Sequence, residues 1–137
     1  MSIVEPTYSA RSYSMGLPTR TLNTMRNHHI VLDSPGLREA IMQGEAFVAA
    51  VSSCAVAIIE RRAPEMEIPL ERIDVSIDAY QNPDIVFFDH IDLHFRMVGP
   101  TQEQAEALVN RFKELCVLFR TISAATTVNT DVAVAAE

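Results

Sequence analysis

Basic residues are few in this sequence, and they are scattered. Eleven lysines and arginines stand against 18 aspartates and glutamates, which gives a net charge of −7. The only basic doublet is Arg61-Arg62, and an acid precedes it. Nucleic-acid binders normally carry a basic patch, and anionic membranes attract polybasic segments. We therefore expect neither a nucleic acid nor a membrane as a partner.

Long apolar runs and targeting segments are also missing. Residues 1–6 contain neither a basic nor an apolar region of the kind that opens a signal peptide. The most apolar stretch, residues 46–59, is too short for a membrane span and carries Ser52, Ser53 and Cys54 in its middle. These features predict a cytoplasmic protein. Its two cysteines should then be reduced, unless a disulfide is part of their chemistry.

The sequence contains no P-loop, dinucleotide fingerprint or Ser-His-Asp order. We accordingly expect no cofactor and no resident metal. The chain has 137 residues and no low-complexity tract, which fits one domain over residues 1–137.

The first half of the chain predicts strands followed by a long helix. Residues 8–15, 19–25 and 29–32 have the composition of strands, and the last two segments could form a hairpin. Residues 37–43 could be one helical turn or a loop. A helix is expected from about Glu45 to Arg62, closed by Pro64. It is apolar on nearly all sides over four turns, which is typical of a helix buried in the core.

The second half predicts a strand pair, a helix and a last strand. In residues 73–79 the odd positions are apolar and the even ones polar, and in residues 85–98 most odd positions are apolar, while the polar even positions are His90, Asp92, His94 and Arg96. This pattern indicates two antiparallel strands with one face on the core. Thr101 and Gln104 form a capping box that starts a helix. Its apolar stripe continues through Phe112 and Cys116 to Phe119. Residues 128–134 alternate again. This order predicts an α+β fold.

The two cysteines are the candidate reactive groups. Cys54 lies in the middle of the first helix among small residues, and Cys116 lies near the end of the second helix. Taken singly, each is most simply a buried structural cysteine. Because each lies on the core face of a long helix, the two thiols could meet in space, which favours redox chemistry.

These segments together resemble the OsmC/Ohr family. The run from Gly44 to Ala55 resembles the family's first-cysteine helix, in which an acidic residue opens the helix and two small residues precede the cysteine. The family's other segments have counterparts in order: its strand-Asp-x-Pro lead-in in residues 27–35, its central strand pair in 70–79 and 91–99, and its second helix, ending at the second cysteine, in 101–116.

The resemblance implies an OsmC-like fold, with antiparallel sheets around a buried central helix that carries Cys54, in an intertwined homodimer. It also implies reduction of organic hydroperoxides. Cys54 would attack as a thiolate and become a sulfenic acid, and Cys116 would condense with it to a disulfide. A dithiol reductant, such as a lipoylated protein, would then reduce that disulfide.

Three positions depart from the family's pattern. The family's thiolate-stabilising arginine stands in a Gly-Gly-Arg turn, whereas the nearest cation here is Arg20, with Arg11 and Arg26 behind it. The glutamate that holds that arginine would fall at Gly44, and Glu45 is one position away, about 100° around a helix. Val117 follows the second cysteine, where the family usually has proline.

Two alternatives therefore stay open. An OsmC-like, stress-related protein could bind a small hydrophobic ligand with little or no peroxidase activity. A metal-binding accessory protein could use His90, Asp92 and His94, which share one face of a strand about 7 Å apart. A transition-metal site needs three or four convergent donors, so a solvated or interface-facing strand is the preferred interpretation of these histidines.

Overall fold

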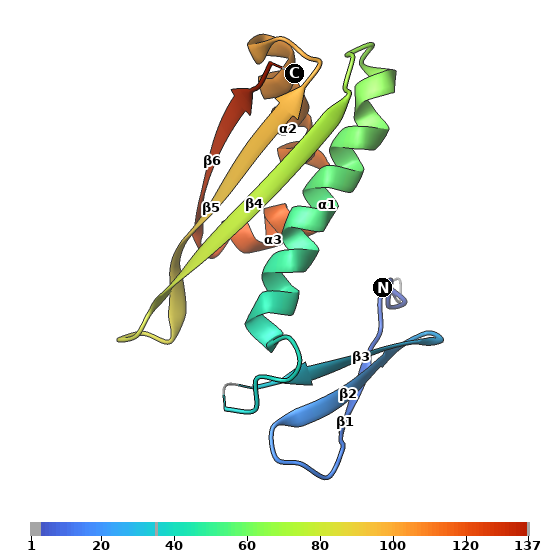
Figure 1. Ribbon diagram of the computed structural model, residues 1–137, viewed down its shortest axis with the longest axis vertical. Coiled ribbons are helices and arrows are strands. Elements are labelled where there is room, and N and C mark those ends of the chain that lie inside the picture. The colour runs from blue at the N-terminus through green and yellow to red at the C-terminus, as the bar shows by residue number, and fades with distance from the viewer. Residues whose placement is uncertain (1–3, 35, 137) are drawn as a thin grey trace. The chain divides into compact units, whose positions relative to one another are not determined.

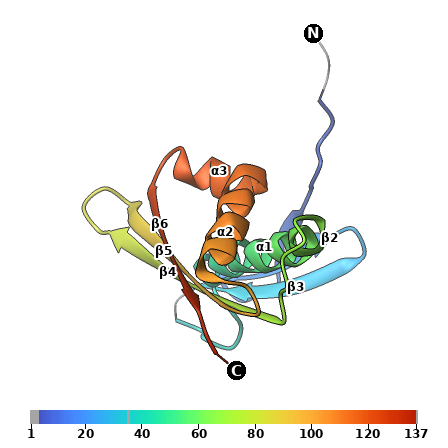
Figure 2. The same cartoon turned by 90° about the horizontal axis from the view of Figure 1, so that it is seen from above.

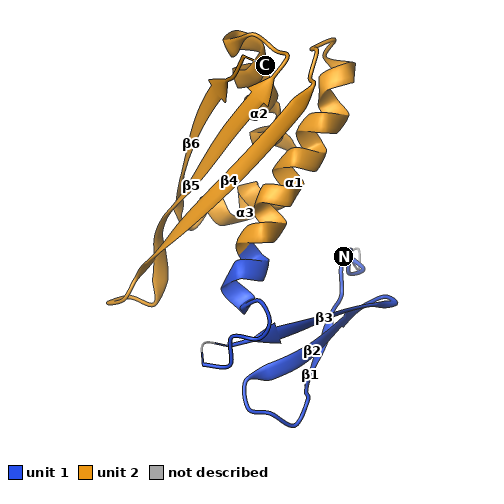
Figure 3. Ribbon diagram, in the orientation of Figure 1, with its two compact units in different colours: residues 1–47 blue, residues 48–137 orange. Residues whose placement is uncertain are grey.

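The computed structural model of the protein describes residues 4–34 and 36–136. The elements follow one another as β1 (Arg11–Ser14), β2 (Arg20–Met25), β3 (His28–Asp33), α1 (Gln43–Glu65), β4 (Arg72–Asn82), β5 (Phe87–Val98), α2 (Gln102–Leu115), α3 (Val117–Ser123) and β6 (Thr127–Val134) (Figure 1). The chain divides into two compact units, residues 1–47 and 48–137 (Figure 3). This mixture of helices and sheets confirms the predicted α+β class, while a single domain over residues 1–137 stays a prediction.

The first unit contains the antiparallel sheet β1-β2-β3. The predicted hairpin is confirmed, because β2 and β3 pair from Arg20↔Asp33 to Met25↔His28 across a two-residue turn. β1 is shorter than expected, and all four of its residues are exposed. Residues 36–42 form turns and bends instead of a helical turn, and Pro35 of the family-like lead-in lies outside the described residues.

The second unit contains the sheet β4-β5-β6. The predicted pairing of its first two strands is confirmed, because β4 and β5 run antiparallel with Ile73 opposite Met97. The expectation of antiparallel sheets is wrong for one strand pair, because β6 pairs parallel to β5. The physical reason lies in the connection: α2 and α3 form a crossover long enough to bring the chain back to the same end of the sheet.

One face of this sheet is covered by helices (Figures 1 and 2). The alternation in β5 buries Ile91, Leu93, Phe95 and Met97 almost completely. The predicted capping box of α2 is confirmed: the Gln104 amide donates to Thr101 Oγ1 at 3.2 Å, and the Thr101 amide donates to Gln104 Oε1 at 3.0 Å.

Gly99 lies where the chain leaves strand β5, shortly before α2 begins. Its φ of +116° disfavours other residues, and an added Cβ would lie 2.9 Å from the Pro69 carbonyl oxygen and 3.0 Å from the Glu71 nitrogen. Because both neighbours are backbone atoms, only glycine allows this close approach.

α1 is only partly buried, so the prediction of a helix buried on all sides is wrong for the single chain. Its buried positions, Val51, Ala55, Ile59 and Ala63, recur every four residues along one stripe. The other side, with Ala49, Ala50, Ser53 and Ala57, is exposed. The sequence is apolar around the helix, but the second unit offers it only one packing surface. Pro64 lies inside the last turn, which continues because the Met66 amide donates to the Arg62 carbonyl at 3.0 Å.

Candidate functional site

The two cysteines meet in the core of the second unit. Cys54 on α1 and Cys116 beyond α2 are both free thiols, with their Sγ atoms 3.4 Å apart. Cys116 is fully buried, while Cys54 is partly exposed. The core faces of the two helices predicted this juxtaposition. At this separation the thiol of Cys116 donates a hydrogen bond to the sulfur of Cys54, and the pair needs only a small movement to form a covalent bond.

The environment of Cys54 favours its neutral form. Burial, reinforced by the hydrogen bond and the charge of the neighbouring Cys116, raises the pKa of Cys54 to about 11, and Arg61 only partly opposes this. Within residues 48–136 no guanidinium donates a hydrogen bond to Cys54 Sγ. In this environment the fraction of Cys54 present as thiolate at neutral pH is very small.

Cys116 lies at a break between two helices. The sequence predicted one apolar stripe running to Phe119, but α2 ends at Leu115 and Cys116 has extended backbone angles. α3 begins at Val117, and the Phe119 amide donates to Cys116 Sγ at 3.3 Å. The cysteine therefore provides the N-cap of α3, a role that its position in the stripe did not indicate.

Arg20, the predicted activating cation, is held by acids of its own unit. Its Nε and Nη2 donate to the two carboxylate oxygens of Asp33 at 2.8 and 3.0 Å, and Nη2 also donates to Glu39 at 2.8 Å. These bonds raise the pKa of Arg20 and lower that of Asp33. Asp33 is fully buried and further accepts the amides of Glu39 and Ala40. Three of the five guanidinium hydrogens are thus used within the unit.

Sequence reasoning missed Asp33 as the partner of Arg20. The hairpin register contained this information. Met25 pairs with His28 beside the turn, and five residues further from the turn on each strand Arg20 pairs with Asp33. Glu45, the predicted holder of the arginine, instead accepts the Met42 amide at 2.9 Å. It stands in the first turn of α1, where a carboxylate suits the positive end of the helix.

The histidines of β5 are engaged by carboxylates. His90 Nδ1 lies 2.8 Å from Asp89, its Nε2 lies 3.7 Å from Asp92, and its ring stacks on Tyr80. His94 lies between Asp131 of β6, at 2.5 Å, and Asp78 of β4, at 3.4 Å. Across residues 4–34 and 36–136, no cluster of three or more His, Cys, Asp or Glu side chains could hold a metal ion. The metal-binding alternative therefore gains no support.

His94 should make stability depend on pH. Its two carboxylate partners raise its pKa in the folded protein, with the hydrogen bond to Asp131 as the largest cause. A raised folded-state pKa stabilises the protein fully below the unfolded value of about 6.5, and this contribution is lost as pH rises through the folded value. The same strand face also carries Asp92 and Arg96.

We therefore expect the melting temperature to fall by a small amount between about pH 6 and pH 9, and His94→Gln to remove this part of the fall. His28→Gln, at an exposed histidine in β3, is the matched control. Equal pH profiles of wild type and His94→Gln would show that the His94 bridge does not contribute.

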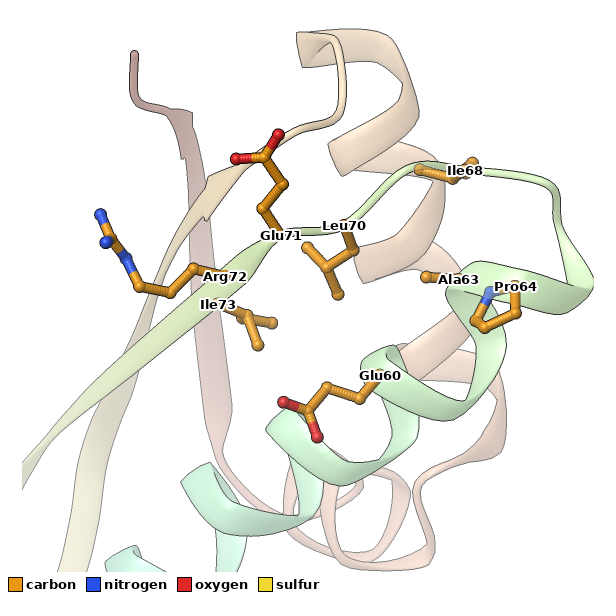
Figure 4. A pocket seen from close by; sticks show the side chains of 8 residues that line it. All are labelled: Glu60, Ala63, Pro64, Ile68, Leu70, Glu71, Arg72 and Ile73. Carbon is orange, nitrogen blue, oxygen red and sulfur yellow. The ribbon is translucent and has the colours of Figure 1, made fainter. Parts of the chain in front are cut away.

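A pocket of about 250 Å³ lies where α1 ends and β4 begins, and it contains none of the predicted site residues (Figure 4). It is lined by Glu60, Ala63, Pro64, Ile68, Leu70, Glu71, Arg72 and Ile73.

In the described part of the chain no helix is long and apolar enough to cross a membrane.

Comparison with solved structures shows the fold. An OsmC-like protein from Mycoplasma pneumoniae matches with a TM-score of 0.85 and 14% identity, covering 96% of this chain and 99% of that one. An organic hydroperoxide resistance protein from Legionella pneumophila matches with a TM-score of 0.76 and 22% identity, covering 96% and 99%. The organic hydroperoxide resistance protein OhrB of Bacillus subtilis matches with a TM-score of 0.70 and 16% identity, covering 92% and 97%.

At these identities the likeness is one of fold, and no curated protein matches the sequence. The model of one protein family, described as OsmC-like protein, does match, over residues 40–131. That segment contains both cysteines, the helix that carries Cys54, and the strands β4 and β5. The protein therefore belongs to the OsmC-like family, as its cysteine helices and central strands predicted.

Proposed function

We propose that this protein is a two-cysteine reductase of organic hydroperoxides. The observation that carries the proposal is the 3.4 Å contact between Cys54 Sγ and Cys116 Sγ. The Cys54 thiolate would attack the terminal peroxide oxygen, the O–O bond would break, and an alcohol would leave with a proton. Cys116 would then displace water from the sulfenic acid, and a dithiol would return two electrons to the disulfide.

The arrangement of the two sulfurs supports these separate roles. Cys54 is the more accessible of the pair, as the attacking residue must be, while Cys116 is buried within reach of it. A sulfenic acid formed beside a second thiol is converted to a disulfide before further oxidation damages it. Two proteins of similar fold are described as organic hydroperoxide resistance proteins, which agrees with the proposed substrate class.

The Cys116→Ser variant tests this assignment. We expect wild type to consume tert-butyl hydroperoxide repeatedly with a dithiol, and faster than hydrogen peroxide, because burial of apolar surface favours a carbon-bearing substrate. Apolar side chains of the second unit, Val51, Leu115 and Phe119, are predicted to provide that surface. Cys116→Ser should turn over once and accumulate a sulfenic acid at Cys54, which dimedone traps and mass spectrometry locates. Sustained turnover by this variant would exclude Cys116 as the resolving residue.

Two observations on Cys54 favour a second function. The raised pKa of Cys54 and the absence of a contacting guanidinium within residues 48–136 suit a protein that binds a small hydrophobic ligand and reduces peroxides little or not at all. This candidate would take the place of the first if no organic hydroperoxide is consumed even at pH 9, where the thiolate fraction of Cys54 is larger than at neutral pH.

We also propose that the protein is an obligate homodimer. The exposed side of α1 carries Ala49, Ala50, Ser53 and Ala57, small residues that allow a second helix to approach closely. Sedimentation at micromolar concentration should give a dimer, and Ala50→Glu should shift it strongly toward monomer by placing a charge in the contact. Ala50→Ser is the matched control and should stay dimeric. A folded wild-type monomer at this concentration would contradict the proposal.

A further inference from the structure

Cys116 is joined to α3 through its sulfur. The residue ends one helix and starts the next: its amide donates to the Phe112 carbonyl at 2.9 Å, and its carbonyl accepts the Arg120 amide at 3.0 Å. Between these bonds, the side chain accepts the Phe119 amide at 3.3 Å and donates its own hydrogen toward Cys54. One sulfur atom thus caps a helix and faces its redox partner.

α3 depends on that cap more than a longer helix would. It has seven residues, none of them buried, and Val117 in its first turn is 68% exposed. The first amides of any helix lack partners inside the helix, and a helix of two turns is marginal without contacts from outside. Phe119 and Ile122 pack against the core, and Arg120 Nη1 donates to the Glu114 carbonyl at 3.3 Å. Besides the cap, α3 is thus held by few contacts.

We propose that the Cys116 thiol is a redox-sensitive cap, and that formation of the Cys54–Cys116 disulfide releases the first turn of α3. The proposal rests on the disulfide step of the proposed function. In that step the S–S bond forms, the S–O bond of the sulfenic acid breaks, and water leaves with the thiol proton. A covalent S–S bond, about 2 Å long, is shorter than the 3.4 Å contact, so forming it requires the two sulfurs to approach each other. In the proposal, Cys116 Sγ takes part in this approach, and the hydrogen bond that it accepts from the Phe119 amide is lost.

The release has a use for the reaction cycle. Cys116 is 0% exposed in the dithiol form, so a dithiol reductant has little access to this half of the pair. A loosened first turn opens the side of Cys116 that faces α3 only after the disulfide has formed. Cap strength and disulfide formation are thermodynamically linked. A change that strengthens the cap therefore shifts the thiol–disulfide equilibrium of Cys54 and Cys116 toward the dithiol form. The Phe119 amide is therefore a positioning group for the second cysteine.

Hydrogen exchange of the wild-type protein tests the proposal without any substitution. The dithiol form is kept in dithiothreitol, and the disulfide form is made with diamide, which takes two hydrogens from the thiol pair. We expect the amides of residues 118–120 to exchange at least about fivefold faster in the disulfide form, the scale of losing one helix cap. Amides in the middle of α2, such as that of Leu108, should not change. Equal exchange in the two forms, or failure of diamide to join the two cysteines, would overturn the proposal.

Two substitutions at Phe119 separate the amide from the ring. Phe119→Pro removes the N–H and the ring, whereas Phe119→Leu removes the ring and keeps the N–H. In a dithiothreitol redox buffer, Phe119→Pro should shift the thiol–disulfide equilibrium about fivefold further toward disulfide than Phe119→Leu does. Val117→Pro is the control for the proline ring, because it occupies the first helical position, keeps the cap and should not shift the equilibrium this way. Equal equilibria for the two Phe119 variants would refute the positioning role.

The experiment distinguishes this inference from the proposed function because diamide, not a peroxide, forms the disulfide. A protein that is inert toward peroxides but loosens α3 on oxidation would refute the proposed function alone. A peroxide reductase with identical exchange in both forms would refute only the redox-sensitive cap.

Discussion

Cys54→Ser should abolish the consumption of tert-butyl hydroperoxide, and the wild-type rate should rise about tenfold for each pH unit between pH 6 and pH 9. The reason is that only the thiolate attacks the O–O bond, and below its pKa a thiol gains thiolate tenfold per pH unit. With the pKa of Cys54 raised to about 11 by burial and by Cys116, this rise should continue through the whole range. Initial rates with excess dithiol, corrected for the dithiol's own reaction at each pH, measure it.

Ser53→Ala is the matched control, because Ser53 is the exposed neighbour of Cys54 on the same helix. It should keep the wild-type rate and pH profile. A rate that levels off near neutral pH would contradict the raised pKa and would indicate that a cation, with Arg20 as the first candidate, acts on the sulfur. Peroxide consumption by Cys54→Ser would instead exclude Cys54 as the nucleophile.

Phe112→Ala should destabilise the folded protein by about 3–5 kcal/mol. The side chain is fully buried, and its ring contacts Phe95 at 5.6 Å and Phe119 at 5.3 Å between centroids. Removing it leaves a cavity between the sheet, α2 and α3 that rigid neighbours fill poorly. Urea unfolding followed by circular dichroism gives the loss, with all variants at one protein concentration because dimerisation would add to stability.

Asn110→Ala, at an exposed position of the same helix, should change stability by less than about 0.5 kcal/mol. Phe112→Leu should lose less than Phe112→Ala because it leaves a smaller cavity. If Phe112→Ala unfolds within about 1 kcal/mol of wild type, Phe112 does not lie in the centre of the core.

Hydrophobic periodicity correctly predicted the elements whose buried faces are covered by other parts of the same chain. β4 alternates over residues 73–79 and β5 over residues 91–97, and α2 has both a capping box and a buried stripe, so their types and faces were predicted correctly. The prediction that α1 is buried on all sides was wrong, because the apolar composition of a helix does not indicate which other elements pack against it. The direction of β6 could not be predicted either, since alternation is the same in parallel and antiparallel strands.

The candidate site was predictable in its cysteines and not in their surroundings. Helical spacing placed Cys54 and Cys116 on core faces, and their sulfurs do meet. No proline or glycine marks the helix break at Cys116 in the sequence. The thiol of Cys116 caps α3 there, and a cysteine is not a recognised helix-start signal. The partners of Arg20 depend on a cross-strand register and on Glu39 in the following loop, which composition alone does not fix.

The parallel pairing of β6 with β5 also imposes an order on folding. β4 and β5 are adjacent in sequence and can pair progressively from the turn that joins them. His94 of β5 and Asp131 of the neighbouring strand β6 are, in contrast, 37 residues apart in sequence. The entropy of closing that loop has to be overcome before the strand pair forms, and α2 and α3 shorten the loop only once they are helical. We expect the hairpin and α2 to assemble early and β6 to join last, with φ-values near zero for substitutions such as Val132→Ala.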